Sequence, residues 1–91
     1  MTTPETQIKQ MVKQYLDLKG VFNYPVLQGM GAYRGIPDRV MHYNGEVHYL
    51  EIKKPKGKLS PSQLDFYLQC QKDGIPYHVI KSLEDIQEIV P

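Results

Sequence analysis

The part of the chain that most constrains its fold is a short stretch near the middle, where an Asn-Gly pair separates two strand-like runs. Asn44-Gly45 is the strongest short-range signal for a β-hairpin, because both positions of a two-residue turn take positive φ and these residues tolerate it. With these residues as the turn, Tyr43 faces Glu46, and the register of every other pair follows. The sequence therefore predicts a hairpin with strands over residues 38–43 and 46–53.

In this register, two acidic residues and a lysine meet at the open end of the hairpin. Asp38 lies directly opposite Glu51, and opposed residues share one face with Cβ atoms about 4.5–5.5 Å apart. Lys53 lies on the same face, two residues beyond Glu51. Opposed like charges destabilise a sheet, so the lysine or a bound divalent cation is expected to offset their repulsion. An E-x-K triplet alone is more often solvated surface, but the register and the preceding Pro37 favour a site.

The two faces of the predicted hairpin differ in character. Leu50 and Ile52 point away from the acidic residues and are candidates for the core. Val40, Val47 and Tyr49 share the face of the acids. We therefore expect a helix to cover part of that face and to keep the site from full solvation.

The same residues resemble the PD-(D/E)xK nuclease signature. Within that superfamily, the chain resembles most closely the virus-type replication-repair nuclease (VRR-NUC) domain in its stand-alone form. The shared pattern is an early Glu in an N-terminal helix, a Gly-x-Pro-Asp segment, an E-x-K strand and a Gln that opens the next helix. Here these are Glu5, Gly35-Ile36-Pro37-Asp38, Glu51-Ile52-Lys53 and Gln63, and the resemblance extends roughly from Pro4 to Ile80.

The resemblance implies a DNA endonuclease that depends on Mg²⁺ or Mn²⁺ and hydrolyses phosphodiester bonds. Asp38, Glu51 and the Ile52 carbonyl would hold the metal, and Glu5 would complete its shell directly or through water. Lys53 would orient the attacking water or stabilise the added negative charge. Gln63 would lie near Lys53 and orient that lysine or the water.

Two of these positions have an alternative, structural role. Glu5 follows Thr3-Pro4 in the first turn of a predicted helix, where any acid stabilises the helix N-terminus. Gln63 follows Ser60 at the spacing of a capping box, in which the Gln side chain accepts from the N-cap N–H. The residues alone favour the structural role at both positions, and the resemblance favours the catalytic one.

Two segments are candidates for contact with DNA. Tyr33 and Arg34 lie in a loop with three glycines over residues 29–35, where Arg34 could meet a phosphate and Tyr33 a sugar or base. Lys54, Lys56 and Lys58 follow the E-x-K strand without an intervening acid and form a candidate phosphate-binding patch. The structural alternative for residues 29–35 is a flexible connector, and for the lysine segment it is a solvated loop.

Periodicity and caps predict the remaining elements. Helices are expected from Pro4 toward Gly20, from Ser60 to Gly74 and after Ser82, with further strands over residues 21–28 and 76–81. A helical crossover before the last strand allows that strand to pair in parallel. The order α-β-β-β-α-β-α predicts an α/β fold with a mixed four-stranded sheet flanked by helices, in agreement with the restriction-endonuclease-like core that the resemblance implies.

Composition limits the organisation and the compartment. The 91 residues, 41% of them hydrophobic with a net charge of +1, predict a single nuclease domain over residues 1–91. Cys70 is the only cysteine, so no intrachain disulfide or Cys-based zinc site is expected, and the three His lack metal-ligand spacing. No run is apolar enough to span a membrane. We expect a cytoplasmic location, in a bacterial or phage-infected cell.

One chain carries one candidate site, whereas cutting two strands or two arms of a junction requires two. Since stand-alone proteins of this kind are expected to pair, we predict a homodimer that acts on branched DNA such as a four-way junction, with Tyr15 and Tyr24 among possible contact residues. The alternatives are a non-catalytic DNA-binding module and a nuclease that cuts other DNA or RNA with a partner protein. Opposed acids argue against the simple binding module.

Overall fold

The Asn44-Gly45 turn sets the geometry of the central hairpin in the computed structural model, which describes residues 4–91. Asn44 and Gly45 have φ of 53° and 76°, as a two-residue turn of this type requires. The strands are β2 (Arg39–Tyr43) and β3 (Glu46–Ile52), and Tyr43 pairs with Glu46. The predicted register is confirmed, although each strand is one residue shorter at the open end than predicted.

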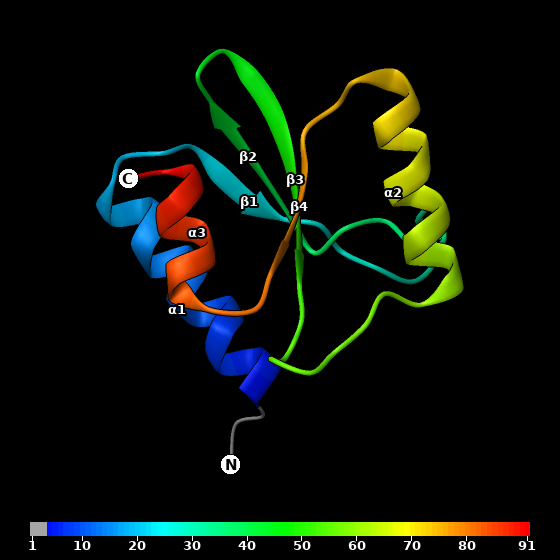
Figure 1. Cartoon of the computed structure of the whole chain (residues 1–91), viewed down its shortest axis with the longest axis horizontal. Coiled ribbons are helices and arrows are strands. Elements are labelled where there is room, and N and C mark those ends of the chain that lie inside the picture. The colour runs from blue at the N-terminus through cyan, green and yellow to red at the C-terminus, as the bar shows by residue number, and fades with distance from the viewer. Residues whose placement is uncertain (1–3) are drawn as a thin grey trace.

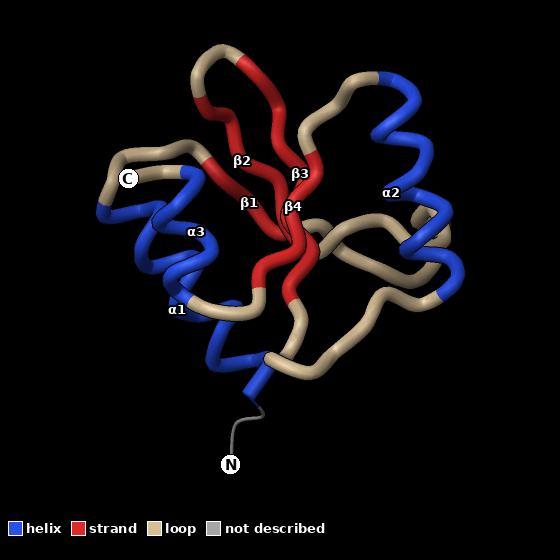
Figure 2. The backbone as a smooth tube through the Cα atoms, in the orientation of Figure 1, coloured by secondary structure: helices blue, strands red, loops and turns tan. Residues whose placement is uncertain are grey.

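The sheet has the order β1-β2-β3-β4 and is mixed, as predicted (Figures 1 and 2). The hairpin strands are antiparallel, and β4 (Tyr77–Ile80) runs parallel to β3 after the crossover helix α2 (Pro61–Asp73). The predicted strand over residues 21–28 was too long, because β1 spans only Asn23–Pro25. Pro25 has no N–H to donate to a ladder, and proline is tolerated in an edge strand such as this one.

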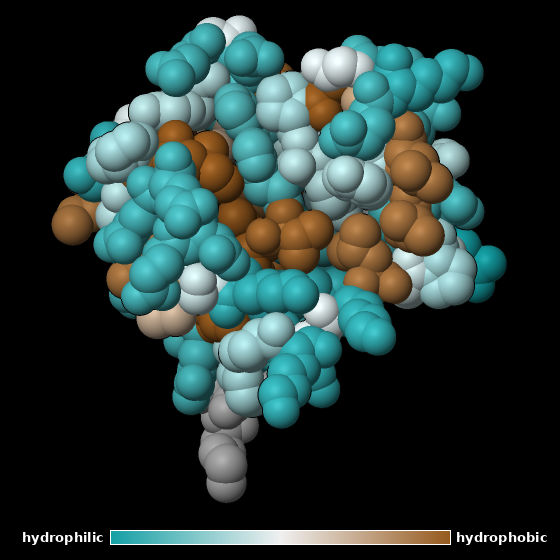
Figure 3. All heavy atoms as spheres, viewed as in Figure 1, coloured by the Kyte–Doolittle hydropathy of each residue, from teal (hydrophilic) through white to brown (hydrophobic). Residues whose placement is uncertain are grey.

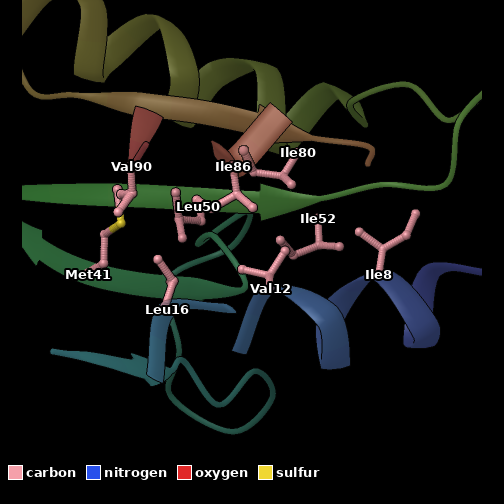
Figure 4. Packing of buried hydrophobic residues seen from close by; sticks show 9 residues of the cluster. All are labelled: Ile8, Val12, Leu16, Met41, Leu50, Ile52, Ile80, Ile86 and Val90. Carbon is pink, nitrogen blue, oxygen red and sulfur yellow. The ribbon is translucent and has the colours of Figure 1, made fainter. Parts of the chain in front are cut away.

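The hydrophobic core lies on one face of the sheet, under α1 (Pro4–Leu18) and α3 (Leu83–Ile89) (Figure 4). Leu50 and Ile52 point into this core, as predicted, and are almost fully buried. Its members are Ile8, Val12, Leu16, Met41, Leu50, Ile52, Ile80, Ile86 and Val90. Thr3, which precedes Pro4 at the predicted start of α1, lies outside the described residues. Among residues 4–91, no helix is long and apolar enough to cross a membrane.

The face that carries the acids is covered by α2 (Figure 1), as predicted. Phe66 of α2 packs edge-on against Tyr49, with ring centroids 5.1 Å apart, and also contacts Tyr77. The cover is incomplete, because Val47 is 44% exposed on the same face. Apolar residues of α2 also face solvent, and brown atoms lie over this helix in Figure 3.

Two histidines that are distant in sequence form a pair on the core face. His48 Nδ1 and His78 Nε2 are 2.9 Å apart, and His48 Nε2 is 3.2 Å from the carbonyl of Tyr43. Because a carbonyl only accepts, His48 carries its proton on Nε2 and His78 donates to His48 Nδ1. Burial and the neighbouring His48 lower the pKa of His78. The pair is thus a satisfied polar contact within the fold.

Candidate active site

The open end of the hairpin brings the two predicted acids together. Regular pairing ends at Arg39 opposite Leu50, so Asp38 and Glu51 occupy the next opposed positions. Asp38 does not continue the ladder, because its side-chain Oδ2 accepts from the backbone N–H of Ile52 over 2.8 Å. This bond turns the Asp38 carboxylate toward β3 and fixes one of its two oxygens.

Glu51 is an acid held almost completely away from water, with 1% of its surface exposed. Its Oε1 accepts from Gln63 Nε2 over 3.0 Å and lies 4.0 Å from Lys53 Nζ. Its Oε2 is buried and has no hydrogen-bond partner among the described residues. Burial raises the pKa of Glu51 from 4.5 to about 8, and the negative charge of Asp38 adds to the effect. The site therefore holds an acid whose charge is poorly compensated by the protein alone.

Gln63 completes the cap of α2 and contacts Glu51 at the same time. Its Oε1 accepts from the Ser60 N–H over 2.8 Å, and Ser60 Oγ accepts from the Gln63 N–H, which completes the predicted capping box. The other end of the same amide donates to Glu51. Lys53 Nζ lies 4.0 Å from the same Glu51 oxygen, so the Gln63 amide and the Lys53 ammonium meet at one carboxylate oxygen. The helix cap thus positions a catalytic candidate.

The Gly-x-Pro-Asp segment requires glycine at its first position, Gly35, because the backbone passes very close to α2 there. The φ of Gly35 is +83°, and a Cβ at this position would lie 2.3 Å from the carbonyl oxygen of Ser62 and 3.0 Å from the backbone nitrogen of Gln63. The loop before β2 therefore packs directly on the first turn of α2. This close approach holds Gln63 beside the end of the hairpin, where Glu51 lies.

A cavity of about 460 Å³ lies at this end of the sheet and is lined by residues of both halves of the motif. It includes the predicted site residues Glu5, Asp38, Glu51, Ile52 and Gln63. Glu5 comes from the first turn of α1, and its negative charge also raises the pKa of Glu51. The first turn of α1 thus lines the same cavity as the two acids of the hairpin.

Two further residues contact Asp38, and the sequence did not reveal them. Lys9 Nζ lies 3.5 Å from Asp38 Oδ1 and 3.8 Å from Glu5 Oε1. Gln28 Nε2 lies 3.4 Å from the same Asp38 oxygen and donates to the Ile36 carbonyl. The only signal for Lys9 is its position one helical turn after Glu5, and Gln28 lies in an irregular loop without any pattern.

The predicted DNA-contacting residues lie outside the lining of this cavity. Tyr33 is 71% exposed in the glycine-rich loop and meets Phe66 edge-on, while Arg34 beside it is also exposed. Lys54, Lys56 and Lys58 are all exposed in the loop between β3 and α2. Lys53 differs from them, because it is 15% exposed and turned toward Glu51.

The donor set at the two acids fits a hard divalent cation. One oxygen of each carboxylate is fixed by a donor, Asp38 Oδ2 by Ile52 and Glu51 Oε1 by Gln63, which leaves the buried Glu51 Oε2 and Asp38 Oδ1 available. One or two carboxylates with water are typical ligands of Mg²⁺. Among residues 4–91, no group of three or more His, Cys, Asp or Glu is arranged to hold a metal.

A mixed four-stranded sheet with helices on both faces, and paired acids at the open end of its hairpin, defines the restriction-endonuclease-like class of α/β domains. The VRR-NUC domain family matches residues 30–84, so the chain belongs to this family of nuclease-type, DNA-acting domains. A solved structure described as a VRR_NUC domain superposes with a TM-score of 0.83 at 22% identity, covering 98% of this chain and 96% of its own. Comparison with curated proteins gave no match.

The close approach of Gly35 to α2 can be tested with Gly35→Ala. Positive φ costs a residue with a Cβ about 1–2 kcal/mol, and this substitution must also displace the Ser62 backbone. We expect a loss of more than about 2 kcal/mol in the free energy of unfolding in urea, together with slower cleavage as Gln63 moves away from Glu51.

Gly31→Ala is the matched control, because Gly31 has φ of +82° but no atom within 4 Å of the point that an added Cβ would occupy. We expect this variant to lose only the backbone cost and to keep its activity. Equal losses for the two variants would contradict a specific role for the contact between Gly35 and α2.

The cost of burying Glu51 can be tested with Glu51→Gln, which keeps an acceptor for Gln63 but removes the acid. The pKa of Glu51 is about 8 in the folded protein, against 4.5 for the free side chain. The wild type therefore loses stability as pH rises from 4.5 to about 8, because only the unfolded chain gives up this proton readily. We expect the variant to lack this loss and to be more stable than the wild type at pH 9 by up to about 5 kcal/mol. Thermal unfolding between pH 5 and pH 9 measures it, and parallel pH profiles for the two proteins would refute the prediction.

Proposed function

We propose that the chain is a metal-dependent endonuclease that hydrolyses phosphodiester bonds in DNA at Asp38, Glu51 and Lys53. The observation that carries this proposal is the buried Glu51 carboxyl, which has one oxygen without a partner among the described residues and lies beside a second acid. Burying an acid without a compensating charge destabilises a protein. Because the positive charge that the chain itself supplies compensates this acid only partly, the arrangement favours a bound cation. Membership of a nuclease-type family supports the same conclusion.

Mg²⁺ or Mn²⁺ is the proposed cofactor. Asp38 and Glu51 would hold it with the Ile52 carbonyl, and Glu5 would reach it directly or through water. When bound, a divalent ion of this kind lowers the pKa of a water and polarises a phosphate oxygen. Gln63 keeps the Glu51 carboxyl in one orientation, and the Ile52 N–H does the same for Asp38.

Lys53 supplies a fixed positive charge at the reacting phosphate. Its ammonium is largely withdrawn from solvent and held 4.0 Å from Glu51 Oε1, so little side-chain freedom remains to be lost when substrate binds. In this position it stabilises the negative charge that develops on the phosphate or orients the attacking water. Arg34, Tyr33 and the exposed lysines Lys54, Lys56 and Lys58 would contact the DNA around the site.

The first test is a cleavage assay on labelled four-way junction, flap, duplex and single-stranded DNA with Mg²⁺, Mn²⁺ or EDTA. We expect metal-dependent cutting that Asp38→Ala abolishes, whereas Lys53→Met binds DNA but cleaves at least about a hundredfold more slowly. Lys56→Met is the control, because this exposed lysine lies outside the cavity and should affect binding more than chemistry. Binding without cutting on every substrate would favour the non-catalytic module, and cutting of labelled RNA in a parallel assay, with no DNA cut, would exclude a DNA nuclease.

A homodimer is the proposed assembly, and branched DNA is the proposed substrate, because each chain carries one such site. An aromatic patch of Phe22, Tyr24 and His42 at the edge of the sheet supports pairing: Phe22 and Tyr24 are 62% and 42% exposed, and the rings of Phe22 and His42 are 4.9 Å apart. Tyr15, the other possible contact residue, is only partly exposed, and its hydroxyl donates to the Val90 carbonyl within the chain.

Sedimentation of Phe22→Lys tests the dimer, since a charge in this patch would be desolvated on pairing. We expect a dimer for the wild type and a monomer for the variant. Leu27→Lys is the control, because Leu27 is 86% exposed outside the patch and should leave the dimer intact. A monomeric wild type at working concentration would rule out the proposed assembly.

A further inference from the structure

Lys9 lines the cavity, yet neither the sequence pattern nor the proposed chemistry gives this lysine a role. It lies on α1, one turn after Glu5, and its side chain extends into the site. The ammonium is 3.5 Å from Asp38 Oδ1 and 3.8 Å from Glu5 Oε1. It therefore bridges the acid of the first helix and the acid of the hairpin.

The oxygen that Lys9 contacts is the one a metal ion would require. Asp38 Oδ2 is already fixed by the Ile52 N–H, so Oδ1 is the oxygen that can turn toward a cation. Gln28 at 3.4 Å is a weak and neutral partner of that oxygen. Among residues 4–91, Lys9 is thus the positive charge within 4.0 Å of Asp38, while Lys53 lies 4.0 Å from Glu51 Oε1.

We propose that Lys9 competes with the divalent ion for Asp38 and Glu5, and so sets the ion concentration at which the site is loaded. This inference rests on the metal-dependent function proposed above. An ammonium and a divalent cation repel each other, so Lys9 must leave Asp38 when the ion binds. The lysine can do so readily, because its side chain is 46% exposed and flexible.

The size of the effect follows from the exposure of the pair. A half-exposed ion pair contributes little free energy, so the loss of the pair between Lys9 and Asp38 changes the affinity for the ion by up to about fivefold. Removing the repulsion between Lys9 and the ion adds to this change. We therefore expect removal of the charge to tighten ion binding about three- to tenfold. The gain should shrink at high salt, because the interaction is partly screened.

Calorimetric titration of Mn²⁺ into the DNA-free protein measures this directly, without any cleavage reaction. The comparison includes wild type, Lys9→Met, Lys9→Arg and Lys13→Met, with circular dichroism to verify folding. Lys13 lies on the same helix and pairs with Asp17 at 2.8 Å, so its removal changes the net charge equally without touching the cavity. We expect tighter binding only for Lys9→Met, and wild-type affinity for Lys9→Arg and Lys13→Met.

The outcomes separate this inference from the function on which it rests. Equal or weaker Mn²⁺ binding by Lys9→Met than by the wild type would overturn the role of Lys9 and leave the proposed metal site intact. The same gain in Lys13→Met would show a general charge effect and would also overturn it. No Mn²⁺ binding by any of the four proteins would overturn the proposed metal site itself.

Discussion

The hairpin register is the constraint on which the rest of the site depends. A turn of two residues with positive φ leaves one way for β2 and β3 to pair, and this pairing places Asp38 opposite Glu51. A shift by one residue would send the acids to the core face and the core residues Leu50 and Ile52 to the site. The packing of α1 and α3 on those two side chains therefore also stabilises the arrangement of the acids.

The site contributes less to the stability of the fold than the hydrophobic core does, because it buries an acid. Glu51 is almost fully buried, and its Oε2 lacks a partner among the described residues, so burial and the nearby Asp38 raise its pKa to about 8. An apolar residue at this position would cost the fold less. The protein instead keeps a poorly compensated acid in a cavity, as is common where perturbed ionisation serves function.

Helix α2 links the stability of the fold to the geometry of the site. Its N-terminal cap uses one end of the Gln63 side chain, and the other end orients Glu51. The approach of Gly35 to Ser62 holds that cap against the loop leading into β2. The Gln63 amide therefore joins the start of α2 to the end of β3, and the close approach of Gly35 adds the loop before β2 to this arrangement.

The sequence by itself determined the features that depend on local backbone chemistry. The turn at Asn44-Gly45, the order of the elements, the capping box and the opposition of Asp38 and Glu51 all follow from residues near one another in the chain. The tertiary structure decided the rest, because it depends on how distant elements pack. The bond from Gln63 to Glu51, the reach of Lys9 from α1 to Asp38 and the depth at which Glu51 is buried have no local signature.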